Sequence, residues 1–237
     1  SNPDFQYMSA VDKDAYPGVK MQRTMILVND KNLYRPAVID VFKVLSEKEH
    51  QYDLPFYYMG HFISSSFKYN PFTSERNLLG KKNGYQHLWK EAEGETKDGL
   101  IVTWLNKNRF YSLINSADST AKIIFTRIGG SDPNFNLRNE PGILIRKNAK
   151  DYTFATVIEP HGVFDPTLEF TKDSYSTIQK VSVVYDSEEY TVVKINGNRG
   201  INWTLMLSNI NADRNKEHEI EYGGIKYKWQ GPIFLQK

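Results

Sequence analysis

The chain has 237 residues, 40% of them hydrophobic, with 30 basic and 28 acidic side chains and a formal net charge of +2. This length allows one or two domains with a full core, and the balanced charge excludes a strong overall attraction to nucleic acid or to an anionic membrane surface. No cysteine is present, which excludes disulfides, zinc–thiolate centres and thiol catalysis.

Short apolar and β-branched segments, separated by turn residues, dominate the chain. The predicted strands cover residues 23–28, 37–45, 100–105, 109–114, 122–127, 142–146, 152–159, 181–185, 190–195, 201–207, 220–222 and 225–229. Two tight turns predict hairpins, one at Asn106-Lys107-Asn108 and one at Gly223-Gly224. We expect single helical turns at 46–49 and 74–79 and a long ordered loop at 129–141.

Strands at this spacing, without a long segment of 3.6-residue period, predict an all-β fold made of antiparallel sheets packed as a sandwich. Helix should account for under about one-tenth of the residues, against ~30–35% in a typical globular protein. No apolar run approaches the ~18 residues of a membrane span. No basic segment leads into an apolar one at the start of the sequence, so no signal peptide is visible.

Asp40 interrupts the apolar strand predicted at 37–45. A carboxylate in such a strand is costly to bury without a partner. A metal ion, an arginine such as Arg23, or backbone donors must therefore satisfy it.

The chain is rich in aromatic side chains, including 15 tyrosines. Tyrosine is common in proteins that handle sugars, and it also suits half-buried strands by β-propensity alone. The four tryptophans fall within apolar segments, which predicts that they belong to the core; they are Trp89, Trp104, Trp203 and Trp229.

Three stretches carry a resemblance to a known family. They are Tyr16-Pro-Gly-Val-Lys-Met-Gln-Arg-Thr-Met with 38–42, His50-Gln-Tyr-Asp-Leu-Pro-Phe-Tyr-Tyr-Met-Gly with 84–89, and 128–138 with 156–162. Together they resemble the C-terminal β-sheet domain of alginate lyases of polysaccharide lyase family seventeen, within the heparinase II/III-like superfamily.

This resemblance implies a bacterial, periplasmic or secreted enzyme that cleaves acidic polysaccharides such as alginate or heparin by β-elimination. It implies an α/α toroid domain before this one, with residues 1–15 as the linker and 16–237 as the β-sandwich. In the family an Asn, a His and a Tyr come from the toroid, so we expect this chain to be inactive alone. The sheet domain adds one tyrosine to the cleft and a bound divalent metal.

Tyr57 and Tyr58 match the family stretch that carries the cleft tyrosine. Adjacent residues of a strand point to opposite faces, so we expect one of the two to act as a catalytic acid or base, with Tyr57 preferred.

Three further residues are candidates for substrate binding. His50, in a predicted loop with Asp53, could tune the tyrosine or serve only as loop scaffold. Arg138 suits bidentate binding of a uronate carboxylate. His161 follows Glu159-Pro160 at a strand end and could bind substrate or pack in a turn.

The metal implied by the resemblance would be held by Gln22, Asp40 and His87. In relatives the position of Gln22 is a histidine, and glutamine is a weaker ligand. We expect zinc rather than calcium.

Two other functions remain open from the sequence: a free-standing carbohydrate-binding module and a structural sandwich. A binding module predicts an exposed row of tryptophan and tyrosine on one sheet face. A lyase domain predicts that the cleft tyrosine, His50 and Arg138 converge beside an uncovered apolar patch.

Overall fold

The computed structural model describes residues 5–132, 134–135 and 137–237. In this part of the chain it contains 21 strands and one three-residue 3-10 helix, η1 (Tyr85–His87). All pairings between neighbouring strands in these residues are antiparallel, and the prediction of an all-β fold with little helix is confirmed. No helix in the described residues is long and apolar enough to cross a membrane.

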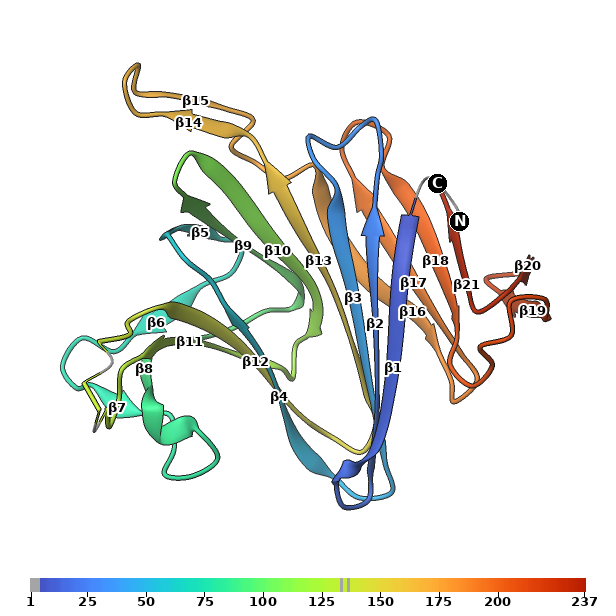
Figure 1. The fold of residues 1–237 in the computed structure, drawn as a ribbon, viewed down its shortest axis with the longest axis horizontal. Helices are drawn as coiled ribbons and strands as arrows, with labels where there is room; N and C mark the ends of the chain where they lie inside the picture. The colour runs from blue at the N-terminus through green and yellow to red at the C-terminus, as the bar shows by residue number, and fades with distance from the viewer. Residues whose placement is uncertain (1–4, 133, 136) are drawn as a thin grey trace.

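The largest sheet, which we call the central sheet, has seven strands and lies in the middle of the molecule (Figure 1). In spatial order its strands are β1 (Phe5–Tyr16), β2 (Val19–Val28), β3 (Ala37–Ser46), β13 (Tyr152–His161), β10 (Arg109–Asp118), β9 (Asp98–Asn106) and β5 (His61–Ser65).

A second sheet, the flanking sheet, covers one face of the central sheet. Its strands are β4 (His50–Tyr57), β12 (Pro141–Ala149), β11 (Lys122–Ile128), β8 (Leu88–Glu95) and β6 (Tyr69–Pro71), with β7 (Asn77–Leu78) also pairing with β8.

A third sheet, the distal sheet, covers the other face of the central sheet. It is built from β16 (Ile178–Asp186), β17 (Tyr190–Gly197), β18 (Asn202–Ser208) and β21 (Ile233–Gln236). Two separate hairpins complete the described chain: β14 (Val163–Asp165) with β15 (Phe170–Lys172), and β19 (Glu217–Tyr222) with β20 (Ile225–Gln230).

Alternation along the central strands explains why both faces of this sheet are covered. On β3, Ile39 and Val41 join the core shared with the distal sheet, whereas Phe42 and Val44 pack in the core shared with the flanking sheet. Successive strand residues point to opposite faces, so one apolar strand supplies two cores. Each fully buried aliphatic side chain contributes about 1.5–3 kcal/mol.

The two tight turns predicted from the sequence are confirmed. β9 and β10 are joined through Lys107, whose φ of 56° is left-handed, and β19 and β20 are joined through Gly223 and Gly224, with φ of 61° and 75°. Positive φ at both central residues is the geometry that two-residue hairpins favour, and glycine adopts it without strain.

Several predicted boundaries are wrong. Residues 5–15, predicted as a linker, belong to the edge strand β1, which pairs with β2; residues 1–4 of that predicted linker lie outside the described residues. Eleven of the twelve residues of β1 are exposed, so backbone hydrogen bonds rather than apolar burial hold this strand in place. The pattern of hydrophobic residues therefore did not reveal it as a strand. The segments 46–49 and 74–79 form no helix, and His50 and Asp53 lie on β4 rather than in a loop.

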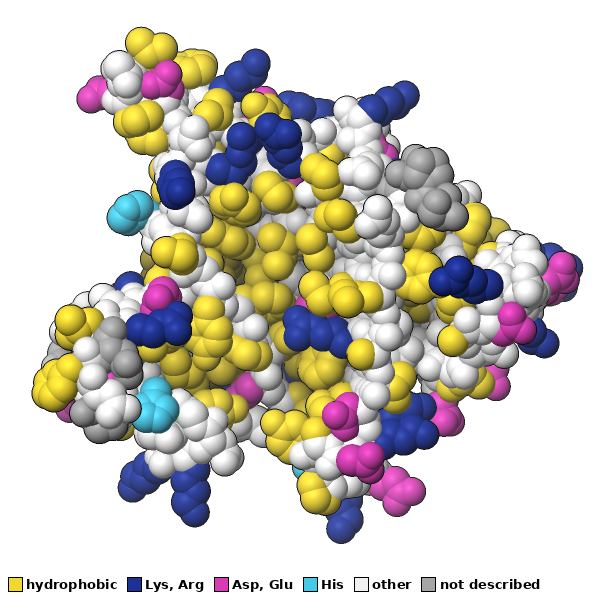
Figure 2. Space-filling model, viewed as in Figure 1, with side chains coloured by type: hydrophobic (Ala, Val, Ile, Leu, Met, Phe, Trp, Pro, Cys, Tyr) yellow, Lys and Arg dark blue, Asp and Glu magenta, His cyan; other side chains and the backbone are white. Residues whose placement is uncertain are grey.

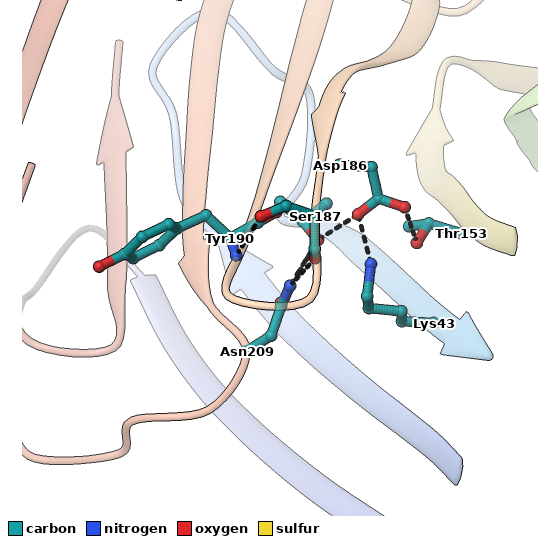
Figure 3. Close-up of polar contacts among 7 residues, drawn as sticks. Lys43, Thr153, Asp186, Ser187, Tyr190 and Asn209 are labelled. Carbon is teal, nitrogen blue, oxygen red and sulfur yellow. Dashed lines mark hydrogen bonds and ion pairs between the residues drawn. The ribbon is translucent and has the colours of Figure 1, made fainter. Parts of the chain in front are cut away.

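A polar cluster between the central and distal sheets joins these two layers (Figure 3). Asp186, at the end of β16, accepts hydrogen bonds from Lys43 Nζ at 2.6 Å, Thr153 Oγ1 at 2.7 Å and Thr191 Oγ1 at 2.7 Å. The Lys43 side chain is only 5% exposed, so the Asp186 carboxylate must compensate its positive charge.

Candidate functional site

The central sheet is not fully covered on the side that faces the flanking sheet. At its β1–β2 edge Met8 is 67% exposed, Leu27 40% and Met25 37%. Figure 2 shows hydrophobic side chains visible across the hollow between these two sheets, with basic side chains among them. We call this surface, formed by the facing sides of the central and flanking sheets, the concave face. Exposed apolar side chains are therefore present on this side of the central sheet, at its β1–β2 edge.

Tyr58 lies on the concave face, at the end of β4. Its ring packs in the core between the two sheets, 5.0 Å from the Trp104 ring, which in turn stacks on Tyr111 at 5.6 Å. No described residue hydrogen-bonds to its hydroxyl. The hydroxyl oxygen is also not fully enclosed by protein atoms. A buried ring thus holds a hydroxyl that solvent can reach.

Two charged side chains, Arg127 and Glu91, act electrostatically on this hydroxyl. Glu91 Oε1 accepts from Arg127 Nε at 2.6 Å and pairs with Arg76 Nη2 at 3.4 Å. Burial raises the pKa of Tyr58 to about 12, while the charge of Arg127 lowers it and that of Glu91 raises it. Two guanidinium groups share one carboxylate here, so this cluster carries an excess positive charge.

Tyr57 points the other way. It is 50% exposed on the outer face of the flanking sheet, and burial raises its pKa. Its ring crosses Gly142 on β12, where a Cβ would lie 2.9 Å from the ring, so glycine is needed at that position. The structure separates the two tyrosines as the strand geometry predicts, and it favours Tyr58 over Tyr57 for the concave face.

His50 is not near either tyrosine. It begins β4, and its Nε2 lies 3.1 Å from Ser46 Oγ in the β3–β4 turn. Tyr57 ends the same strand, and a rise of ~3.3 Å per residue places the two residues about 23 Å apart along β4. The expected convergence of His50 with the tyrosine is therefore wrong, because a full strand separates them.

Arg138 and His161 also take other positions. Arg138 lies in the β11–β12 loop and forms an ion pair with Glu140, with Nε 3.1 Å from Oε1. His161 is 1% exposed and is held between Ser112 Oγ and Asp173 O, each at 2.9 Å. Burial lowers the pKa of His161. It points away from the concave face, so turn packing describes it better than substrate binding.

The three residues predicted as metal ligands do not form one centre. Asp40 is in register with Met25, so Gln22, three residues from Met25, points to the opposite face of the central sheet. His87 is exposed on η1, with Nδ1 3.1 Å from Ser131 O. The described residues contain no group of three His, Cys, Asp or Glu side chains that could hold a metal ion. The residues present do not fit the implied zinc or calcium ion.

Asp40 is instead satisfied by Arg23, one of the three alternatives open from the sequence. Arg23 Nε and Nη2 bind the two carboxylate oxygens at 2.9 Å and 2.6 Å, and this pairing raises the pKa of Arg23. A guanidinium fork matches both oxygens of a carboxylate, so the charge of Asp40 needs no further cation.

We expect Arg23→Leu to lower the free energy of unfolding by about 2 kcal/mol, because it leaves the buried Asp40 carboxylate unpaired. Asp40→Asn in the same chain should restore much of the loss. A chelator should leave the urea midpoint of the unmodified protein unchanged. A clear drop in that midpoint on chelation would show that a metal stabilises the fold.

Sequence reasoning missed most of the cluster that Arg76, Glu91 and Arg127 form near Tyr58. Of the arginines, Arg138 was selected rather than Arg127, and the roles of Glu91 and Arg76 and the packing of Trp104 against Tyr58 were not expected. The sequence signal that could have pointed to this cluster was an arginine, Arg127, near the end of a strand whose alternate residues are apolar. Of the four tryptophans, three are buried as predicted; Trp89 is half-buried under the Arg76 guanidinium.

The exposed tyrosines do not form a row. Two of them lie at distant positions of β1 and the others on different segments of the described chain: Tyr7, Tyr16, Tyr34, Tyr57, Tyr69 and Tyr175. The described residues therefore do not show the exposed row of tryptophan and tyrosine on one sheet face that a free-standing binding module predicts.

Comparison with known proteins reveals two similar enzymes. The chain is 35% identical over 233 residues to an alginate lyase of Stenotrophomonas maltophilia strain K279a, covering 98% of this chain and 31% of the relative. It is 36% identical over 237 residues to an exo-oligoalginate lyase of Saccharophagus degradans strain 2-40, covering 98% and 32%. The chain thus spans about a third of the length of each of these relatives.

Among solved structures, the comparison finds that of a heparan sulfate lyase HepC mutant from Pedobacter heparinus. It shares 12% sequence identity at a TM-score of 0.46, covering 88% of this chain and 27% of that one. No protein-family model matches the chain. The chain is therefore homologous, over nearly all of its length, to about a third of two enzymes named as alginate lyases.

Proposed function

We propose that this domain lines one side of the substrate cleft of an enzyme that cleaves uronic-acid polysaccharides by β-elimination, in the periplasm or outside the cell. The observation that supports it most directly is the solvent-reachable hydroxyl of Tyr58, set on a buried ring beside Arg127. The two relatives are named for lyase activity on alginate or its oligomers, which makes alginate the first substrate to test.

The chemistry requires two proton transfers. A base removes the proton at C5 of the uronate, the C4–C5 double bond forms, and the bond from C4 to the bridging O4 breaks as that oxygen takes a proton. Burial raises the pKa of Tyr58 to about 12, so its phenol is protonated at neutral pH and suits the acid role toward O4. The phenolate left behind faces Arg127, whose positive charge stabilises it. The base would come from another part of the whole enzyme.

A chimera tests this function. The matching third of the Stenotrophomonas alginate lyase is replaced by this chain, and absorbance of the unsaturated product is followed on alginate and on heparin. We expect elimination activity in the chimera and none from the chain alone. A folded chimera that cleaves neither polymer would contradict the proposal and leave a carbohydrate-binding or structural role.

A further inference from the structure

We propose that Arg76 and Arg127 together bind the carboxylate of an acidic sugar beside Tyr58. The proposal rests on the proposed function of the concave face and names residues that would select charged sugars over neutral ones. Arg76 lies between β6 and β7, and Arg127 lies near the end of β11, so the site exists only after the flanking sheet has formed.

The two guanidinium groups have donors to spare. Arg127 uses Nε for Glu91 and Nη1 for the backbone oxygen of Asn139 at 3.1 Å, which leaves Nη2 without a hydrogen-bond partner among the described residues. Arg76 uses only Nη2, for Glu91. Their side chains are 30% and 56% exposed, so the free N–H groups can reach a ligand in solvent.

Charge balance distinguishes this cluster from other arginine pairs in the protein. Arg23 with Asp40 and Arg146 with Asp53 are one-to-one forks in which two nitrogens meet two oxygens, so each pair is neutral. At Glu91 both arginines meet the same oxygen, Oε1, and one positive charge remains. A uronate carboxylate would balance that charge, and arginine suits carboxylate recognition through its planar fork.

Trp89 holds Arg76 in place. The Arg76 guanidinium lies over the Trp89 ring, 5.3 Å from its centroid, in a cation–π arrangement. An arginine stacked on an aromatic ring loses less side-chain freedom on binding a ligand than a free one does. The Trp89 indole N–H is also a reporter for events at Arg76.

The test uses this chain, labelled with nitrogen-15, and follows the Trp89 indole signal by NMR. The ligands are a uronic-acid trimer and the same trimer with its carboxyl groups reduced to alcohols. We expect the charged trimer to shift the Trp89 signal and to bind more weakly at high salt, whereas the neutral trimer should have little effect. Arg76→Gln and Arg127→Gln should each raise Kd by about tenfold to a hundredfold, the range of a charge-assisted hydrogen bond.

Glu91→Gln provides a change in the opposite direction. It removes the acid that the two arginines share, so it should lower Kd, a result that structural damage cannot mimic. Arg146→Gln is the matched control, because it removes an arginine paired with Asp53, on the outer face of the flanking sheet, and should leave Kd unchanged. Urea unfolding of each variant confirms that it is folded.

Equal binding of the charged and neutral trimers, or a Kd unchanged by Arg76→Gln and Glu91→Gln, would overturn the proposal, as would no binding at all. These outcomes are separate from those of the chimera. An active chimera with unchanged Kd in the variants would keep the lyase function and reject this site. Charge-dependent binding with an inactive chimera would keep the site and reject the lyase function.

Discussion

Tyr58→Phe in the chimeric lyase is expected to lower kcat by about 10²–10⁴, the usual contribution of a general acid, with little change in KM. The change removes one hydroxyl and keeps the ring that packs 5.0 Å from Trp104, so the core between the central and flanking sheets should survive. Product absorbance at saturating alginate gives kcat, and urea unfolding checks the fold.

Tyr57→Phe is the matched control for this experiment. It makes the same chemical change one residue away, on a side chain that is 50% exposed on the outer face of the flanking sheet. Its kcat should stay close to that of the unmodified chimera. If Tyr57→Phe were the damaging change and Tyr58→Phe were silent, the outer face rather than the concave face would line the cleft.

Asp186→Ala is expected to reduce the free energy of unfolding by about 3 kcal/mol, because removing one partner of a buried ion pair leaves the other charge unsatisfied. Lys43 would lose its partner at 2.6 Å while its side chain stays only 5% exposed. Thr153 and Thr191 would each lose an acceptor as well (Figure 3). Urea unfolding measures the loss.

The double variant Lys43→Met, Asp186→Leu separates the cost of an unpaired charge from the value of the pair itself. It replaces both charged groups by apolar ones, so most of the lost stability should return. A double variant as unstable as Asp186→Ala would mean that the hydrogen bonds from the two threonines, not the charge of Lys43, hold the central and distal sheets together.

Local sequence was sufficient for the strands that alternate or end in tight turns. β3 was predicted from its run of apolar residues, which the structure shows filling two cores. The β19–β20 hairpin was predicted because Gly223 and Gly224 accept positive φ. It was insufficient for β1, which is exposed along nearly its whole length and is held by backbone hydrogen bonds to β2. Hydrogen bonds between backbones leave no trace in side-chain composition.

The sequence by itself determined that this protein is all-β and that two adjacent tyrosines point to opposite faces of one sheet, since a strand has a period of two. Only the tertiary structure decided which of the two faces the central sheet, because the choice depends on which face of β4 packs against that sheet. It also decided that Arg76 and Arg127 meet at Glu91 and that Gln22 and Asp40 point to opposite faces of the central sheet. These residues come from different strands and loops, and contacts between them are set by sheet order and register, which no local pattern encodes.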